Sequence, residues 1–302
     1  MIKRIYIYYK ERYPILPRFI LGLIVFLEIY FIILLNMGVT WKDVHLGMAE
    51  FTGAFTVFAF LLWLRVADDL KDFETDKRLF PDRPLPSGRV LKKDIIITCA
   101  IAQAIVLGLN IAFMRENLIF LGILYFYGFL MSKWFFKKKK IQPSLPLALI
   151  THNPVQAFIN LYIISFTIRK YGLPAFSLTN IMALWTLYFP ALIWEVSRKI
   201  RAPKDETDYT TYSKLFGYRD STIFVLILTI VDIITNFILV WNLNKISVAV
   251  LALLVSWMTW KFVQFIKNPE RFVIVEKVEL YTYLQESTML LTIVCFIIFG
   301  KI

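Results

Sequence analysis

The sequence contains little charge, cysteine or histidine. Only 19% of its 302 residues are charged and 58% are hydrophobic, with a mean hydropathy of +0.63. A soluble globular chain is nearer a quarter charged and half apolar. The two cysteines, Cys99 and Cys295, and the two histidines show no metal-ligand spacing, which argues against a zinc site or a disulfide framework. The longest polar stretches, 68–94 and 197–220, are too short to form a soluble domain.

The chain instead supplies apolar segments long enough to cross a bilayer as helices, in which the backbone satisfies its own hydrogen bonds. The first has no small-residue cleavage site, so we expect a retained helix. The sequence thus predicts an all-α, polytopic membrane protein that forms a single domain over 1–302. The nine predicted spans are 19–36, 47–67, 95–113, 117–135, 144–167, 177–196, 221–241, 246–266 and 281–299.

The distribution of lysine and arginine predicts the orientation of these spans. With the N-terminus inside, 28 of the 34 basic residues lie on the inner side, and the outer side keeps Lys42, Arg115, Arg169, Lys170, Lys245 and Lys301. This positive-inside bias predicts a cytoplasmic N-terminus, in the inner membrane if the protein is bacterial. The net charge of +12 is then explained by orientation and by attraction to anionic lipid, and we expect no nucleic-acid partner.

The first polar loop is rich in acids. It reads DDLKDFETDKRLFPDRPLPSGR from Asp68 to Arg89, with six carboxylates in its first 15 residues. Asp68, Asp72 and Asp76 share one face if the preceding helix continues, and Asp69 is their neighbour. Like charges at this spacing destabilise a helix, and a divalent cation would offset the repulsion. Oxygen ligands without His or Cys favour Mg²⁺. The alternative is a solvated loop whose acids merely lie among basic residues.

This loop resembles the first aspartate-rich motif of the UbiA superfamily of intramembrane prenyltransferases, N/D-D-x-x-D-x-x-x-D followed by RPxxxG. The resemblance implies nine helices around a central cavity with a cytoplasmic-side active site. It also implies Mg²⁺ and a prenyl diphosphate as cofactor and substrate. The resemblance implies that Asp69, Asp72 and Asp76 are the metal-binding carboxylates. Asp68 stands where many members have Asn. Arg83 matches the arginine of the motif and would contact the diphosphate.

The second polar loop follows the sixth span, just as the first loop follows the second span. Each loop is followed by two further spans, and this repeated layout suggests an internal duplication. Most of the family has a DxxxD cluster here, followed by threonine and glycine, which Thr211 and Gly217 match. The front half departs from that pattern and resembles a variant branch, E-x-x-R-K-x-R-x-P-x-D-E. A second metal would rest on Glu195 with Asp205 or Glu206, while Arg198, Lys199 and Arg201 would hold diphosphate charge. The alternative is a positive-inside loop with incidental acids.

Further polar residues lie at or within the spans. Lys133 stands where related enzymes tend to have the lysine of Tyr-x-x-x-Lys, so we expect either a diphosphate contact or a snorkelling side chain. Asn153 lies in THNPVQAFIN beside Pro154 and is a candidate substrate contact. Asp232 and Asn236 share a helical face, and Gln285 and Glu286 lie in the last span. Such groups either line an acceptor pocket or bond helices together.

These features predict a Mg²⁺-dependent prenyltransferase that moves an isoprenyl group to a lipophilic acceptor (aromatic, quinone-precursor or lipid) within the bilayer. One alternative is a UbiA-type terpene cyclase that needs no acceptor. The other is a transporter without chemistry, which would carry broken helices with charges at the membrane midplane, whereas the strong charges here lie at helix ends.

Overall fold

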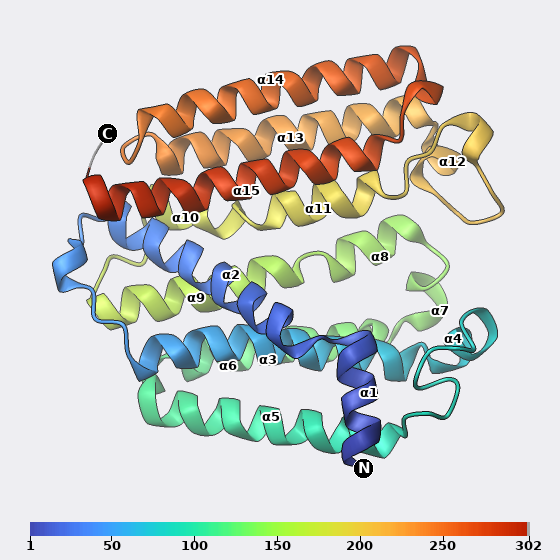
Figure 1. Cartoon of the computed structure of the whole chain (residues 1–302), viewed down its shortest axis with the longest axis horizontal. Helices are drawn as coiled ribbons and strands as arrows, with labels where there is room; N and C mark the ends of the chain where they lie inside the picture. Colours follow the sequence, from blue (N-terminus) through green and yellow to red (C-terminus); the bar gives the residue numbers. More distant parts are fainter. Residues whose placement is uncertain (301–302) are drawn as a thin grey trace. The chain divides into compact units, whose positions relative to one another are not determined.

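The computed structural model describes residues 1–300, and every regular element in that range is helical (Figure 1). This confirms the predicted all-α class. The α-helices are α1 (Ile2–Arg12), α2 (Ile15–Asn36), α3 (Met48–Lys71), α4 (Phe73–Leu79), α5 (Lys92–Phe113), α6 (Leu118–Ser132), α7 (Lys138–Ile141), α8 (Leu145–His152), α9 (Val155–Tyr171), α10 (Leu178–Trp185), α11 (Tyr188–Ser197), α12 (Tyr212–Phe216), α13 (Tyr218–Val240), α14 (Lys245–Lys267) and α15 (Ile274–Phe299). Short 3₁₀ turns are η1 (Trp41–Asp43), η2 (Arg115–Asn117), η3 (Trp134–Phe136), η4 (Pro203–Asp205) and η5 (Pro269–Arg271).

Seven helical segments among the described residues are long and apolar enough to cross a membrane: α2, α3, α5, the α8–α9 pair, α13, α14 and α15. Each has 22 to 27 residues. At about 1.5 Å per residue, that length covers the roughly 30 Å of hydrocarbon in a bilayer. The chain is a multi-pass integral membrane protein.

The expectation that each of the nine predicted spans is one continuous long helix is wrong for three of them, one of which is 144–167, divided into α8 and α9. The span at 117–135 contains α6, which has only 15 residues and stops at a run of positive φ values over Trp134, Phe135 and Phe136. The span at 177–196 is broken into α10 and α11. Pro190 lies in the first turn of α11, where it cannot donate a backbone hydrogen bond to the carbonyl of Thr186, so the helix restarts there.

The described chain divides into two compact units. Unit 1 comprises Met1–Leu27, His45–Lys138 and Ser165–Leu173. Its centre is α3, which packs along α5. The Asn110 amide donates to Thr56 Oγ1 at 2.9 Å, and the Tyr13 hydroxyl donates to the Phe58 carbonyl at 2.9 Å. These bonds attach α5 and the C-terminal end of α1 to α3.

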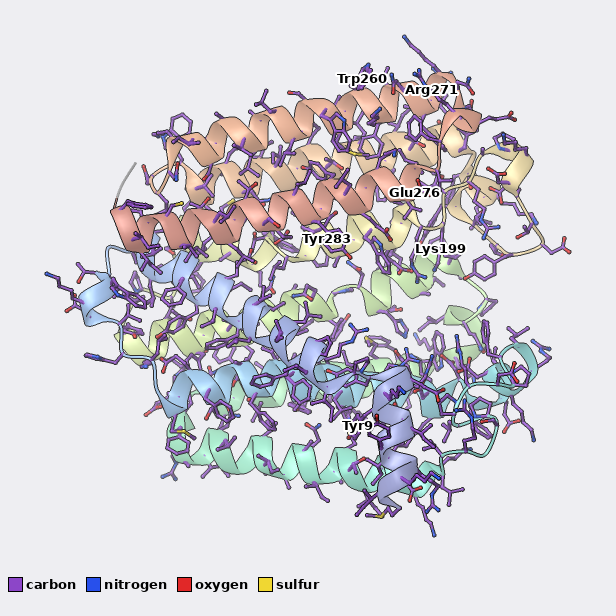
Figure 2. The ribbon with its side chains drawn as sticks, viewed as in Figure 1. Tyr9, Lys199, Trp260, Arg271, Glu276 and Tyr283 are labelled. Atoms are coloured by element: carbon purple, nitrogen blue, oxygen red, sulfur yellow. The ribbon has the colours of Figure 1, made fainter. Side chains whose placement is uncertain are left out.

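Unit 2 comprises Glu28–Val44, Lys139–Ile164 and Pro174–Ile302. In it α13, α14 and α15 run side by side, with α11 against α13 and α15 (Figure 1). Their shared core contains Ile193, Val225, Met258, Phe262 and Val278, all fully or almost fully buried. By contrast, Trp260 on α14 and Tyr283 on α15 are 53% and 72% exposed (Figure 2). Large exposed apolar side chains on long helices are what a lipid-facing surface requires.

Candidate active site

The acidic run of the first loop lies in unit 1, at the end of the long helix α3. Asp68 and Asp69 belong to the last turn of α3, Asp72 is its C-cap, and Asp76 lies in the short helix α4. The backbone N–H of Asp72 donates to Asp68 O at 3.0 Å, and that of Asp76 donates to Asp72 O at 2.8 Å. The helical turn therefore continues through the boundary, which keeps the side chains of Asp68, Asp72 and Asp76 on one side.

Asp69 is directed elsewhere and is fully engaged by protein groups. Its Oδ1 accepts from Arg12 Nη2 at 2.7 Å and from Arg65 Nη2 at 2.5 Å, and its Oδ2 accepts from the Tyr8 hydroxyl at 2.9 Å. Only 5% of Asp69 is exposed. Burial and the Asp69 charge raise the pKa of Tyr8, so this hydroxyl remains a donor. In this structure Asp69 anchors the N-terminal helix α1 to α3.

The other three acids are less constrained. Asp68 pairs with Lys71 at 2.8 Å, and Asp76 pairs with Arg83 at 2.8 Å. The Arg83 guanidinium also lies 3.8 Å from the centre of the Phe80 ring. Within residues 1–300, the Asp72 carboxylate has no hydrogen-bond or ion-pair partner. Burial raises its pKa, Lys71 opposes that shift, and the charges of Asp68 and Asp76 add to it.

These residues match a hard cation by chemistry but are not gathered as a metal-ligand set. Within the described part of the chain, no group of three or more His, Cys, Asp or Glu side chains is arranged to hold a metal ion. Asp72 offers an unpaired carboxylate, and Asp68 and Asp76 each retain an oxygen that no cation contacts. Mg²⁺ takes one or two carboxylates together with waters and phosphate oxygens, so this donor set fits that ion.

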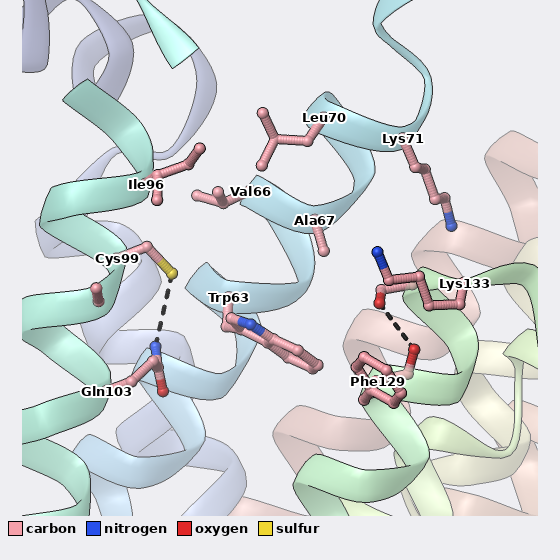
Figure 3. Close-up of a pocket in the computed structure, with 12 residues that line it drawn as sticks. Trp63, Val66, Ala67, Leu70, Lys71, Ile96, Cys99, Gln103, Phe129 and Lys133 are labelled. Atoms are coloured by element: carbon pink, nitrogen blue, oxygen red, sulfur yellow. Dashed lines mark hydrogen bonds between the residues drawn. The ribbon is translucent and has the colours of Figure 1, made fainter. Parts of the chain in front are cut away.

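A pocket of about 490 Å³ lies beside the acidic run, between α3, α5 and α6 (Figure 3). Its wall is mostly apolar and includes Trp63 and Phe129. Lys71, next to Asp72, lies on the same side of it as Lys133. The lysine selected from the sequence therefore shares a pocket with a lysine of the acidic run, a contact that sequence spacing did not indicate.

A second pocket of about 390 Å³ shares Gln103 with the first and has Leu107, Leu118 and Leu121 in its wall. The Gln103 amide donates to the Ala59 carbonyl at 3.0 Å, and the Tyr125 hydroxyl donates to Gln103 Oε1. The first pocket thus has cations at one side, and the second is lined almost entirely by apolar groups. Unit 1 can accommodate an amphiphile with an anionic head and an apolar chain.

The second loop belongs to unit 2, and its predicted metal ligand Glu195 is held by cations. Glu195 Oε2 accepts from Arg198 Nε at 2.6 Å, and Oε1 pairs with Lys199 Nζ at 2.9 Å. Figure 2 places Lys199 at the end of α11. Burial raises the pKa of the neighbouring Tyr212 to about 12, and the Glu195 charge adds to the shift.

The rest of this loop is closed by its own hydrogen bonds. Glu206 accepts from Thr211 Oγ1 at 2.9 and 2.8 Å and from Ser213 Oγ, while Thr211 also caps α12. Arg201 donates to Thr207 Oγ1 at 2.9 Å. Asp205 ends the turn η4 and is exposed. Glu195 and Glu206 are thus each held by partners of their own, and among residues 1–300 no group of three or more His, Cys, Asp or Glu side chains, these acids included, could hold a metal ion.

Asn153 is the C-cap of α8, at the break before α9. Its Nδ2 atom is buried without a hydrogen-bond partner. Residues of α8 also line an apolar pocket of about 450 Å³, together with Tyr212, Ser221 and Phe224. The Ser221 hydroxyl is likewise buried without a partner in the described chain. Unit 2 therefore has polar atoms available to a ligand near the second loop.

Sequence reasoning missed the groups that hold Asp69. Tyr8 and Arg12 belong to the segment before the first span, where aromatic and basic residues are ordinary interfacial anchors. Their pairing with Asp69 is distant in sequence, so no local spacing reveals it. Arg65 precedes Asp69 by four residues, and that i, i+4 pair is a signal that the sequence does carry.

Comparisons with known proteins support the fold. No protein-family model matches the chain, and no curated protein sequence matches it. A solved structure, described as that of digeranylgeranylglyceryl phosphate synthase in membranes, matches with a TM-score of 0.67 and 16% sequence identity. The alignment covers 97% of this chain and 99% of that one, and the synthase is a UbiA-superfamily prenyltransferase. The chain has the UbiA fold. The resemblance inferred from the acidic loop is confirmed at the level of the fold.

Proposed function

We propose that this protein is a Mg²⁺-dependent membrane prenyltransferase, which moves an isoprenyl group from an allylic prenyl diphosphate to a lipophilic acceptor. The observation that carries the proposal is the acidic run at the end of α3 beside a pocket with Lys71 and Lys133 on one side. The UbiA fold supports it. We further propose nine crossings with a cytoplasmic N-terminus, which places both polar loops on the inner side.

Asp68, Asp72 and Asp76 would hold Mg²⁺, which neutralises diphosphate charge when bound. Asp72 is the first choice because its carboxylate has no competing cation in the described chain. Asp69 would reach a metal only by releasing Arg12 or Arg65, so we assign it a positioning role. Arg83 already contacts Asp76, and its remaining donors suit a diphosphate oxygen.

The residues of unit 1 then perform distinct tasks. Lys71 and Lys133 attract the anionic head, and the apolar walls of the two pockets accommodate the isoprenyl chain and exclude water. The bond between the allylic carbon and the diphosphate oxygen breaks, and the diphosphate leaves with the electron pair. An acceptor atom forms a new bond to that carbon and loses a proton. Stabilising the departing charge is the main contribution that these residues make.

The second loop would add positive charge. Lys199 and Arg198 are paired with Glu195, and Arg201 has donors beyond its bond to Thr207. A second metal on Glu195 would have to compete with both cations, so we propose that the cations themselves contact phosphate. The matched synthase is named for a glyceryl phosphate product, which makes phosphate-bearing glycerol lipids one acceptor class to test here.

The proposal is tested with purified protein in lipid nanodiscs, incubated with C10 to C20 prenyl diphosphates and Mg²⁺. Aromatic, quinone-precursor and glycerol-phosphate acceptors are added separately, and products are identified by mass spectrometry. We expect diphosphate release that requires Mg²⁺ and an acceptor. Asp72→Asn should reduce the rate on the order of 100-fold or more, whereas Asp82→Asn, in the exposed part of the same loop, should not. A terpene formed without acceptor would assign a cyclase instead, and no turnover under any condition would reject the proposal.

A further inference from the structure

Three acidic residues of unit 2 have buried carboxyl oxygens, although Glu286 as a whole is only partly buried. Glu28 is near the middle of α2, Asp232 is near the middle of α13, and Glu286 is near the middle of α15. Glu28 is 1% exposed and Asp232 is fully buried. All three helices are among the membrane-spanning candidates. Ionisable groups at this depth are costly and mark functional sites by default.

Positive charge does not compensate these acids. No ion pair among residues 1–300 includes Glu28, Asp232 or Glu286. A different buried acid shows the contrast: Glu50 in unit 1 is 5% exposed and pairs with Lys170. The cluster in unit 2 must therefore be neutralised by something other than a basic side chain.

The hydrogen-bond pattern separates Asp232 from the two glutamates. Asp232 accepts with both oxygens, from Gln285 Nε2 at 2.7 Å and from Asn236 Nδ2 at 3.2 Å. These two amides satisfy both oxygens of Asp232. Glu28 and Glu286 are instead within hydrogen-bonding reach of each other. A carboxylate has no proton to donate, so such a contact requires one of the two groups to be protonated.

The outer oxygens of that pair are unsatisfied. Glu28 Oε1 and Glu286 Oε2 are buried and have no hydrogen-bond partner in the described chain, and the same holds for the Tyr281 hydroxyl. The other titratable groups that act on the pair are Asp232, from α13, and Tyr281, from α15 itself.

We propose that Glu28 and Glu286 form a proton-binding site inside the membrane, in which the two carboxyl groups share one proton between α2 and α15. Asp232 is held by its two amides and lies outside this pair. The site is independent of the prenyl transfer proposed above and lies on different residues. Its ligand is a proton, and its removal would leave two adjacent carboxylates in an apolar environment.

Infrared spectroscopy of the full-length protein in nanodiscs at neutral pH tests this directly, because a protonated carboxyl group has its own carbonyl stretching band. We expect a band from one protonated glutamate per chain, which shifts when the protein is made with carboxyl-labelled glutamate and not with labelled aspartate. Glu28→Gln and Glu286→Gln should each remove or shift the band, because the two residues share one proton. Asp232→Asn and Glu50→Gln should leave it unchanged.

The proposal is overturned if the unmodified protein has no protonated glutamate band, if both glutamine variants retain it unaltered, or if Asp232→Asn abolishes it. The isotope experiment needs no variant, so it decides the question even if a substitution prevents folding. Prenyltransferase activity is not a readout here. Failure of the proton site and failure of the proposed enzyme function are therefore distinguishable.

Discussion

Replacement of Asp69 by asparagine tests whether this residue is a structural anchor or a metal ligand. The substitution removes the charge that faces Arg12 and Arg65 and leaves the two guanidinium groups close together without a counter-ion. Removing one partner of a buried ion pair costs about 3–5 kcal/mol. The arginine side chains are 17% and 33% exposed, so solvent relieves part of that cost. We expect a loss of about 2–3 kcal/mol.

The assay is thermal unfolding of purified protein in a single detergent, where this loss corresponds to a decrease of roughly 4–6 °C in Tm. Asp68→Asn is the matched control, since Asp68 is 42% exposed on its side chain and pairs only with Lys71. Its effect should stay below about 1 kcal/mol. Arg12→Gln combined with Asp69→Asn should cost less than the two separate losses added together. Equal stability of Asp69→Asn and Asp68→Asn would refute the anchoring role.

Two further predictions concern stability. Gly53→Ala should destabilise the protein by about 1–3 kcal/mol because a Cβ there would overlap the Phe26 ring. Gly108→Ala is the control, since Gly108 has open space around it, and it should be neutral or slightly stabilising. Thermal unfolding compares the two variants, and equal effects would contradict the packing argument. The hydrogen bond from Arg89 lowers the pKa of Glu11, so its stabilisation is present above the unfolded-state value and is lost as pH falls through the lowered folded value. Tm measured against pH should show a step in this acidic range that Arg89→Gln removes, and an unchanged profile in that variant would argue against the pair.

The sequence predicted where most membrane helices lie because long apolar runs are sufficient to define them. It did not predict the break between α10 and α11, since a single proline in an apolar run is compatible with a kinked span as well as with two helices. Pro154 favours a kink for the same reason, and the structure divides α8 from α9 there.

The spacing of the acidic run predicts that Asp68, Asp72 and Asp76 lie on one side of a helix. The helical turn from Asp68 to Asp76 agrees with that prediction. What spacing could not supply is the set of distant partners. Asp69 is engaged by Tyr8 and Arg12, and Lys71 shares a pocket with Lys133. Such contacts depend on how helices pack, so a set of metal ligands inferred from a motif includes residues that the fold uses for another purpose.

The interpretation of the strong charges as lying at helix ends was incomplete. Asp232 and Glu286 are polar groups within spans, and Glu28 is a further lone acid in the apolar helix α2. The burial of Glu28 and Asp232 in unit 2 follows from the packing of helices that are distant in sequence. Pairing of this kind is visible only in three dimensions.

Calorimetric titration of a non-hydrolysable prenyl diphosphate analogue into the protein, with and without Mg²⁺, tests the central claim most directly. We expect binding that requires Mg²⁺, that is lost in Asp72→Asn, and that is retained in Asp82→Asn. Binding that is equally tight without Mg²⁺, or that is unaffected by Asp72→Asn, would contradict the assignment of the acidic run at the end of α3 as the diphosphate site.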